Sequence, residues 1–134
     1  MIHEAQVQFT QDEKTVKENV LTEGFDLFAE VEAKLIEEYS GYEDVDVTAI
    51  KRSKIKEIAN ARTERTADDD LIFTATLVDV FLNDDGSEKE TKYDIAFFSK
   101  NMDTAHAYIK EYVSQGYNLA IKGIKETKFV DVLK

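Results

Sequence analysis

The chain has 134 residues, the length of one ordinary domain, and 43% of them are hydrophobic. Its formal net charge of -11 and its eight Phe and six Tyr indicate an acidic globular protein, not a disordered one. The absence of cysteine excludes disulfides, thiolate metal sites and a cysteine nucleophile. No apolar run is long enough for a membrane helix and no signal peptide is visible at the N-terminus, so we expect a cytoplasmic protein.

The first half of the chain predicts two strands, a helix and a further strand. The peptides EAQVQF (4–9) and KTVKENVL (14–21) read as strands, the second less clearly than the first. Apolar residues recur at helical spacing from Phe28 to Tyr39, with Asp26 as the expected N-cap and Gly41 as the expected stop. The alternating run 45–49 then predicts a strand with one covered face.

The second half repeats this order. LIFTATLVDVFL (71–82) and KYDIAFF (92–98) predict strands joined by a turn at Asp85-Gly86. A helix is expected over 102–113, with Asn101 as its N-cap and Gly116 at its end, and it is followed by a strand over 119–123.

An internal repeat explains this order. Shifting the chain by 74 residues aligns the peptide VTAIKRSKIKEI (47–58) with IKGIKETKFVDV (121–132). The sequence therefore predicts an α+β fold in which a strand-strand-helix-strand unit is used twice, with two helices and one mainly antiparallel sheet of about six strands. We expect a single domain with a shared core, in which repeat one covers about 3–58, a linker covers 59–70 and repeat two covers about 71–134.

The segment 71–82 is apolar on both alternating faces. One side carries Leu71, Phe73, Ala75 and Leu77, and the other carries Ile72, Val78, Val80 and Leu82. A sheet covered by helices on one face leaves part of the second side exposed, which favours a homo-oligomer, such as a dimer. Alternatively, the strand twists enough to bury different faces along its length.

Three peptides carry a resemblance to a known family: EVEAKLIEEY (30–39), VTAIKRSKIKEI (47–58) and IKETKFVDVL (124–133). They resemble a domain of unknown function found in gut bacteria and their phages. The resemblance implies a phage or mobile-element setting, and it supplies no activity and no catalytic residue.

The residues themselves form no recognisable catalytic, metal or cofactor motif. His3 and His106 lie in different elements without metal-ligand spacing, and we expect both at the surface. Paired carboxylates such as Glu37-Glu38 are typical of solvated faces. We therefore predict no catalytic residue, no metal and no cofactor, and we keep an unfamiliar small hydrolase as an alternative.

Basic residues gather where the two copies match. A ligand-binding patch is predicted from five of them: Lys51, Arg52, Lys54, Lys125 and Lys128. Such a patch suits a phosphate-bearing molecule, whereas the alternative interpretation is that these lysines protect edge strands and balance nearby acids.

The negative charge disfavours general nucleic-acid binding, because the protein would repel a polyanion. Our leading hypothesis is a non-catalytic phage or mobile-element protein that inhibits a host defence or nucleic-acid-handling protein with a basic surface. The alternative is a protein that sequesters a nucleotide immune signal on the basic patch.

Overall fold

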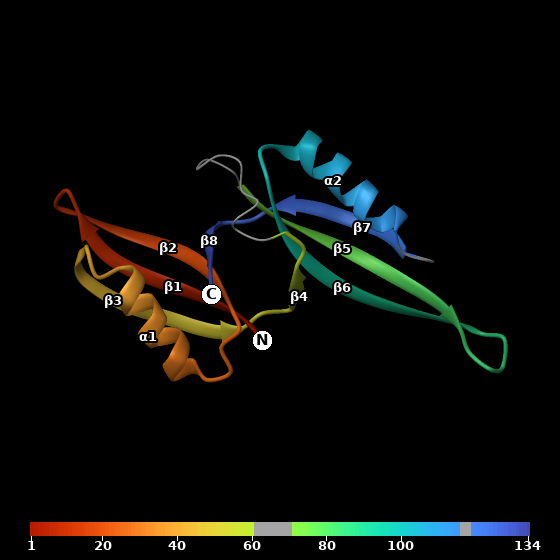
Figure 1. The fold of residues 1–134 in the computed structure, drawn as a ribbon, viewed down its shortest axis with the longest axis horizontal. Coiled ribbons are helices and arrows are strands. Elements are labelled where there is room, and N and C mark those ends of the chain that lie inside the picture. The colour runs from red at the N-terminus through yellow and green to blue at the C-terminus, as the bar shows by residue number, and fades with distance from the viewer. Residues whose placement is uncertain (61–70, 116–118) are drawn as a thin grey trace. The chain divides into compact units, whose positions relative to one another are not determined.

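The structure is a computed structural model that describes residues 1–60, 71–115 and 119–134. The chain divides into two compact units, which Figure 1 shows as separate sheets with one helix each. Unit 1 comprises Met1–Ser53 and Lys128–Lys134, and unit 2 comprises Lys54–Thr127. Most of the predicted linker and the expected helix stop at Gly116 lie outside the described residues.

Unit 1 is a four-stranded sheet covered by one helix. Its elements are β1 (Ile2–Gln11), β2 (Lys14–Glu23), α1 (Phe28–Glu38), β3 (Glu43–Arg52) and β8 (Phe129–Leu133). The strand order is β3-β1-β2-β8, with β8 parallel to β2 and the other pairs antiparallel. Alternating residues of β1, from Ala5 to Phe9, pack with Val31 and Leu35 of α1, so this face forms the core. The opposite face has no helix of unit 1 and is called the open face, although Leu21 on it is 0% exposed.

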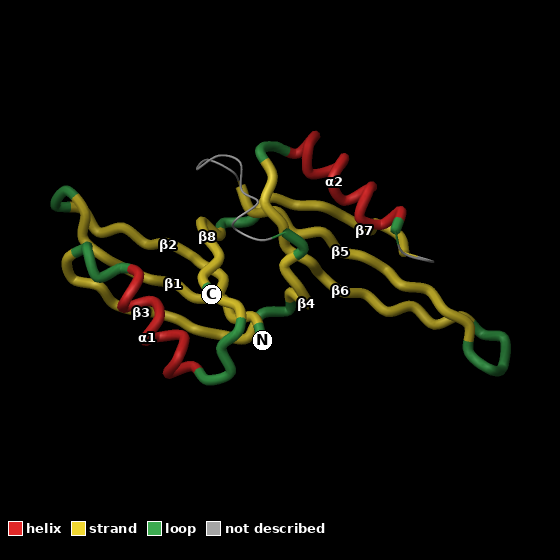
Figure 2. Tube along the Cα trace, viewed as in Figure 1, coloured by secondary structure: helices red, strands yellow, loops and turns green. Residues whose placement is uncertain are grey.

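Unit 2 has the same plan. Its elements are β4 (Ile55–Ile58), β5 (Leu71–Leu82), β6 (Glu88–Ser99), α2 (Met102–Ser114) and β7 (Leu119–Glu126), and the strand order is β4-β6-β5-β7. Phe73, Ala75 and Leu77 of β5 pack with Ala105 and Ile109 of α2. Figure 2 shows one helix (red) and one group of strands (yellow) in each unit.

The strand registers repeat between the units in detail. Gln6 of β1 pairs with both Asn19 and Ala49, and Thr76 of β5 pairs with Asp94 and Gly123 at the corresponding points. An extra residue on the third strand follows directly in both sheets, between Ala49 and Val47 and between Gly123 and Ile121. The third strands match at the predicted shift of 74, whereas the first strands match at a shift of 70, because Gln6 corresponds to Thr76.

The last strand of each repeat completes the sheet of the other unit. β4 follows β3 in the chain but pairs with β6 in unit 2, and β8 follows β7 but pairs with β2 in unit 1. The chain passes between units at Ser53–Lys54 and again at Thr127–Lys128. Each compact unit therefore contains most of one repeat and a single strand of the other.

The α+β class is confirmed, whereas the expectation of one sheet with about six strands is wrong. The eight strands form two four-stranded sheets, because the residues after Ser53 and after Thr127 are strands in the opposite unit. Asn101 is the N-cap of α2 as predicted, and its side chain accepts a hydrogen bond from the Thr104 N–H at 2.9 Å. The N-cap of α1 is Leu27 and not Asp26. The single domain and the shared core stay predictions.

β5 supports the alternative that different faces are buried along its length. Ile72 and Val78 are 1% and 7% exposed, although they lie on the face opposite α2. Apolar surface remains at both ends of the strand, where Leu71 is 37%, Phe81 is 40% and Leu82 is 72% exposed. The homo-oligomer stays a prediction, and its apolar surface is smaller than the sequence pattern indicates.

The strand exchange predicts that neither half of the chain folds alone. A chain of residues 1–60 lacks β8, which buries Val132 and Leu133, and a chain of residues 71–134 lacks β4, which buries Ile55. We expect each fragment by itself to lack a cooperative thermal transition by circular dichroism. An equimolar mixture should form a 1:1 complex by analytical ultracentrifugation and regain the transition. A fragment that melts cooperatively without its partner would contradict the exchange.

Candidate functional site

The open face of unit 1 holds an open recess of about 240 Å³. It is lined by residues from all four strands and from the residue before β8: Glu4, Ala5, Gln6, Asn19, Ala49, Lys51, Lys128 and Phe129. Register places them together, because Glu4 is opposite Lys51, Gln6 is opposite Asn19 and Asn19 is opposite Phe129. Paired residues of neighbouring strands point to the same face of a sheet, which here is the face without a helix.

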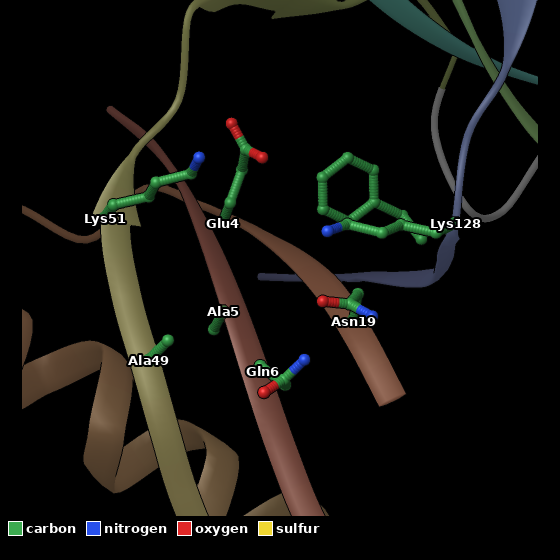
Figure 3. A pocket seen from close by; sticks show the side chains of 8 residues that line it. Glu4, Ala5, Gln6, Asn19, Ala49, Lys51 and Lys128 are labelled. Atoms are coloured by element: carbon green, nitrogen blue, oxygen red, sulfur yellow. The ribbon is translucent and has the colours of Figure 1, made fainter. Parts of the chain in front are cut away.

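Two lysines from different repeats line this recess from opposite sides. Lys51 is the next-to-last residue of β3, and Lys128 directly precedes β8. Figure 3 shows their side chains reaching toward one another from opposite sides of β1, with Glu4 between them and Gln6 farther along β1. Both lysines are exposed, and their two ammonium groups outnumber the single carboxylate of Glu4. The recess is therefore a positive area on a chain of net charge -11.

The predicted basic patch is divided by the fold. Lys51 and Lys128 line the recess in unit 1, whereas Lys54 and Lys125 belong to unit 2. Arg52 pairs with His3 and so lies on the helix side of its sheet, away from Lys51. The sequence identified the lysines but not their partners, because Glu4, Gln6 and Asn19 become neighbours of Lys51 only through strand pairing.

The recess can bind an anion and a polar planar group. The lysines provide ammonium donors, and the side-chain amides of Gln6 and Asn19 provide both donors and acceptors. Phe129 adds an aromatic side chain that is half-buried. Within the described ranges, no group of three or more His, Asp or Glu side chains is placed to hold a metal ion. No helix of the described chain is long and apolar enough to cross a membrane.

Comparison with known proteins identifies the family. Residues 2–134 match a family model described as Domain of unknown function (DUF4494). The chain belongs to this family. No curated protein and no solved structure matches it.

The DUF4494 chain also buries a polar pair that the sequence did not reveal. His3 is 0% exposed, so the expectation of a surface histidine is wrong for this residue, and Thr22, its partner across β1 and β2, is 0% exposed as well. Neither ring nitrogen of His3 nor the Thr22 hydroxyl has a hydrogen-bond partner among the described residues. The equivalent positions in unit 2 are Phe73 and Phe97, which pair across β5 and β6 and stack with ring centroids 6.1 Å apart.

The surroundings of His3 favour its neutral form. Burial lowers the pKa of His3 below its ordinary value of 6.5, and the positive charges of Arg52 and the N-terminal amine add to this effect. Asp26 acts in the opposite direction and raises the pKa of His3. The ring also packs edge-on against Phe28 of α1, with the centroids 5.4 Å apart.

We predict that His3→Phe stabilises the DUF4494 chain. The substitution copies the residue of unit 2 and removes two buried polar atoms without partners, each worth about 1–3 kcal/mol. Because folding lowers the pKa of His3, the unfolded chain binds more protons, and the wild type should lose stability as pH falls below about 6.5. His3→Phe should lose less between pH 7 and pH 5, measured by urea unfolding. His106→Gln, at an exposed position, is the control and should behave as wild type.

Proposed function

We propose that this protein is a non-catalytic binding protein, and that the recess of unit 1 holds a phosphate-bearing nucleotide. The observation that supports this function is that Lys51 and Lys128 reach from opposite sides over a surface that also offers two amides and Phe129. Of the two functions that the sequence favours, we put the sequestering of a nucleotide first, because residues of the predicted basic patch line this recess. The catalytic alternative gains no group of carboxylates in this recess, where Glu4 is the only acid.

Each part of the recess corresponds to one part of a nucleotide. Ammonium groups form short, charge-assisted hydrogen bonds with phosphate oxygens. The amides of Gln6 and Asn19 match the donors and acceptors on the edge of a base, and an aromatic ring can stack on its face. A recess of about 240 Å³ is smaller than a typical ligand pocket of roughly 300–1,000 Å³, so the ligand remains partly exposed to solvent.

The charge of the whole chain limits the ligand to a small molecule. A net charge of -11 repels a long polyanion over the chain as a whole, whereas a mononucleotide interacts mainly with the two nearby lysines. We place this activity in the cytoplasm of a bacterial host, in a protein of phage or mobile-element origin that withholds a nucleotide immune signal.

Charge reversal in the recess tests this function. In the double variant Lys51→Glu/Lys128→Glu, we expect the affinity for AMP to fall at least 100-fold, because each lysine-phosphate hydrogen bond contributes about 1.5–3 kcal/mol. The side-chain amide signals of Gln6 and Asn19 in a ¹⁵N NMR spectrum report on this recess alone. They should shift when AMP is added to the wild type and stay unchanged in the variant.

The matched control is Lys14→Glu/Lys110→Glu, which changes the charge by the same amount at exposed positions outside the recess. It should keep the AMP-dependent shifts of Gln6 and Asn19. Wild-type amide signals that do not respond to millimolar AMP would overturn the proposed function.

A second candidate function is inhibition of a host defence or nucleic-acid-handling protein by contact, and one feature of unit 2 favours it. β7 pairs with β5 only as far as Asp79, so residues 80–90 form a hairpin arm whose strands pair only with each other among the described residues. Figure 2 shows this arm extending past the end of β7. The arm carries the exposed Phe81 and Leu82, and its acidic residues are Asp84, Asp85, Glu88 and Glu90. An apolar strand end flanked by carboxylates complements a basic surface with an apolar centre.

The turn of the arm is as predicted, with Gly86 at a φ of 86° and its N–H bonded to the Asn83 carbonyl at 3.0 Å. We expect Asp84→Lys/Glu88→Lys to lose at least tenfold in the recovery of a basic protein captured from infected host lysate. Glu32→Lys/Glu37→Lys reverses two exposed acids of α1 and should recover that protein as the wild type does. Equal recovery by both variants would exclude the arm as the contact surface.

A further inference from the structure

The open face of unit 2, the face without a helix of that unit, repeats the strand pairings of the recess in unit 1 with different side chains. Thr74 and Val78 on this face are each only 7% exposed, so its accessible groups are the charged side chains around them. Lys125 of β7 pairs with Thr74, as Lys51 pairs with Glu4, and Asp94 takes the position of Asn19. Lys54 directly precedes β4, as Lys128 directly precedes β8, and Ile55 pairs with Asp94 as Phe129 pairs with Asn19. The exchange of strands thus gives each unit one lysine from each repeat.

Unit 2 adds two further lysines to this face. Lys92 is opposite Val78, two residues along β6 from Asp94, and Lys122 is the extra residue of β7 beside Gly123. The two side chains are close enough that the Lys92 ammonium group lowers the pKa of Lys122, while Glu90 acts in the opposite direction. The corresponding residues of unit 1 are Lys17 and Thr48, so this pair of like charges is present only in unit 2 among the equivalent positions.

Like charges side by side on an exposed surface repel each other, and a bound anion relieves this repulsion. Asp94 does not cancel the pair, because its carboxylate accepts a hydrogen bond from the Thr76 hydroxyl at 2.6 Å and so is held beside β5. The same carboxylate repels a phosphate, which is thereby directed toward Lys92 and Lys122.

We propose that the open face of unit 2, with Lys92, Lys122, Lys125 and Lys54, is a second nucleotide site that prefers ligands with several phosphates. On the equivalent surface, unit 1 offers three lysines and Glu4, because Lys17 takes the position of Lys92, whereas unit 2 offers four lysines with Asp94 and Glu90. One chain therefore binds two nucleotides, and the two sites differ in the phosphate charge that they select. This inference rests on the proposed function, since it assigns the same class of ligand to the equivalent face.

Isothermal titration calorimetry with magnesium-free ATP measures the number of sites. We expect two equivalents of ATP per wild-type chain and one equivalent in Lys92→Gln/Lys122→Gln. In that variant, the affinity of the remaining site for ATP should lie within twofold of the affinity of the unit 1 site in the wild type. Lys51→Gln/Lys128→Gln should also bind one equivalent. Replacing ATP by AMP should weaken the unit 2 site at least tenfold, measured in Lys51→Gln/Lys128→Gln, and weaken the unit 1 site less. The control Lys14→Gln/Lys110→Gln should keep two equivalents.

The outcomes separate this inference from the proposed function. One equivalent in the wild type, lost in Lys51→Gln/Lys128→Gln and kept in Lys92→Gln/Lys122→Gln, would overturn the second site and leave the recess of unit 1 in place. One equivalent that is kept in Lys51→Gln/Lys128→Gln and lost in Lys92→Gln/Lys122→Gln would support the site in unit 2 and overturn the proposed function. Absence of heat with both ATP and AMP would overturn both.

Discussion

The exchange of one strand between the two repeats is the constraint on which the rest of the structure depends. β7 and β8 are separated by Thr127 and Lys128, which together bridge roughly 11 Å at most. To complete the sheet of its own repeat, β8 would have to lie beside β6, three strand spacings or about 14 Å from β7, after returning along the length of the sheet. Two residues cannot make that crossover. The strand therefore pairs in the other unit, and the same geometry applies to β3 and β4.

The exchange also determines which side chains meet. In unit 1 the Ser53 N–H donates to the Ile2 carbonyl at 2.9 Å, and in unit 2 the Thr127 N–H donates to the Ile72 carbonyl at 2.9 Å. These equivalent bonds fix the points at which the chain leaves each sheet. Lys54 and Lys128 follow them directly, so each lysine enters the opposite unit together with the single strand that its repeat contributes there. A binding surface made this way requires both repeats, although it lies within one unit.

Much of the fold could be predicted from local patterns, because alternation and helical spacing depend on neighbours in the chain. The two helices, the two hairpins and the cap at Asn101 follow from such patterns, and so does the duplication. The partners of β4 and β8 do not, because a short strand of four or five residues carries the same pattern whichever sheet it joins. The lysines of the candidate site could be predicted from the sequence for the same local reason. The amides of Gln6 and Asn19 could not, because strand pairing brings them beside the lysines.

The buried His3 shows what a single sequence shift misses. A shift of 74 aligns the third strands but matches His3 with Leu77 instead of Phe73, because the first strands match at a shift of 70. The strand pairing shows that His3 corresponds to Phe73, at a shift of 70, and that Thr22 corresponds to Phe97, at a shift of 75. The aromatic pair in one copy therefore corresponds to an inward-facing pair in the other. The two copies have thus diverged on both faces of the sheet. Unit 2 has the apolar core pair and the more basic open face, whereas unit 1 has the polar core pair and the amide-lined recess.

Because each sheet requires a strand from the other repeat, the less stable core of unit 1 weakens the anchoring of β8, and with it the position of Lys128.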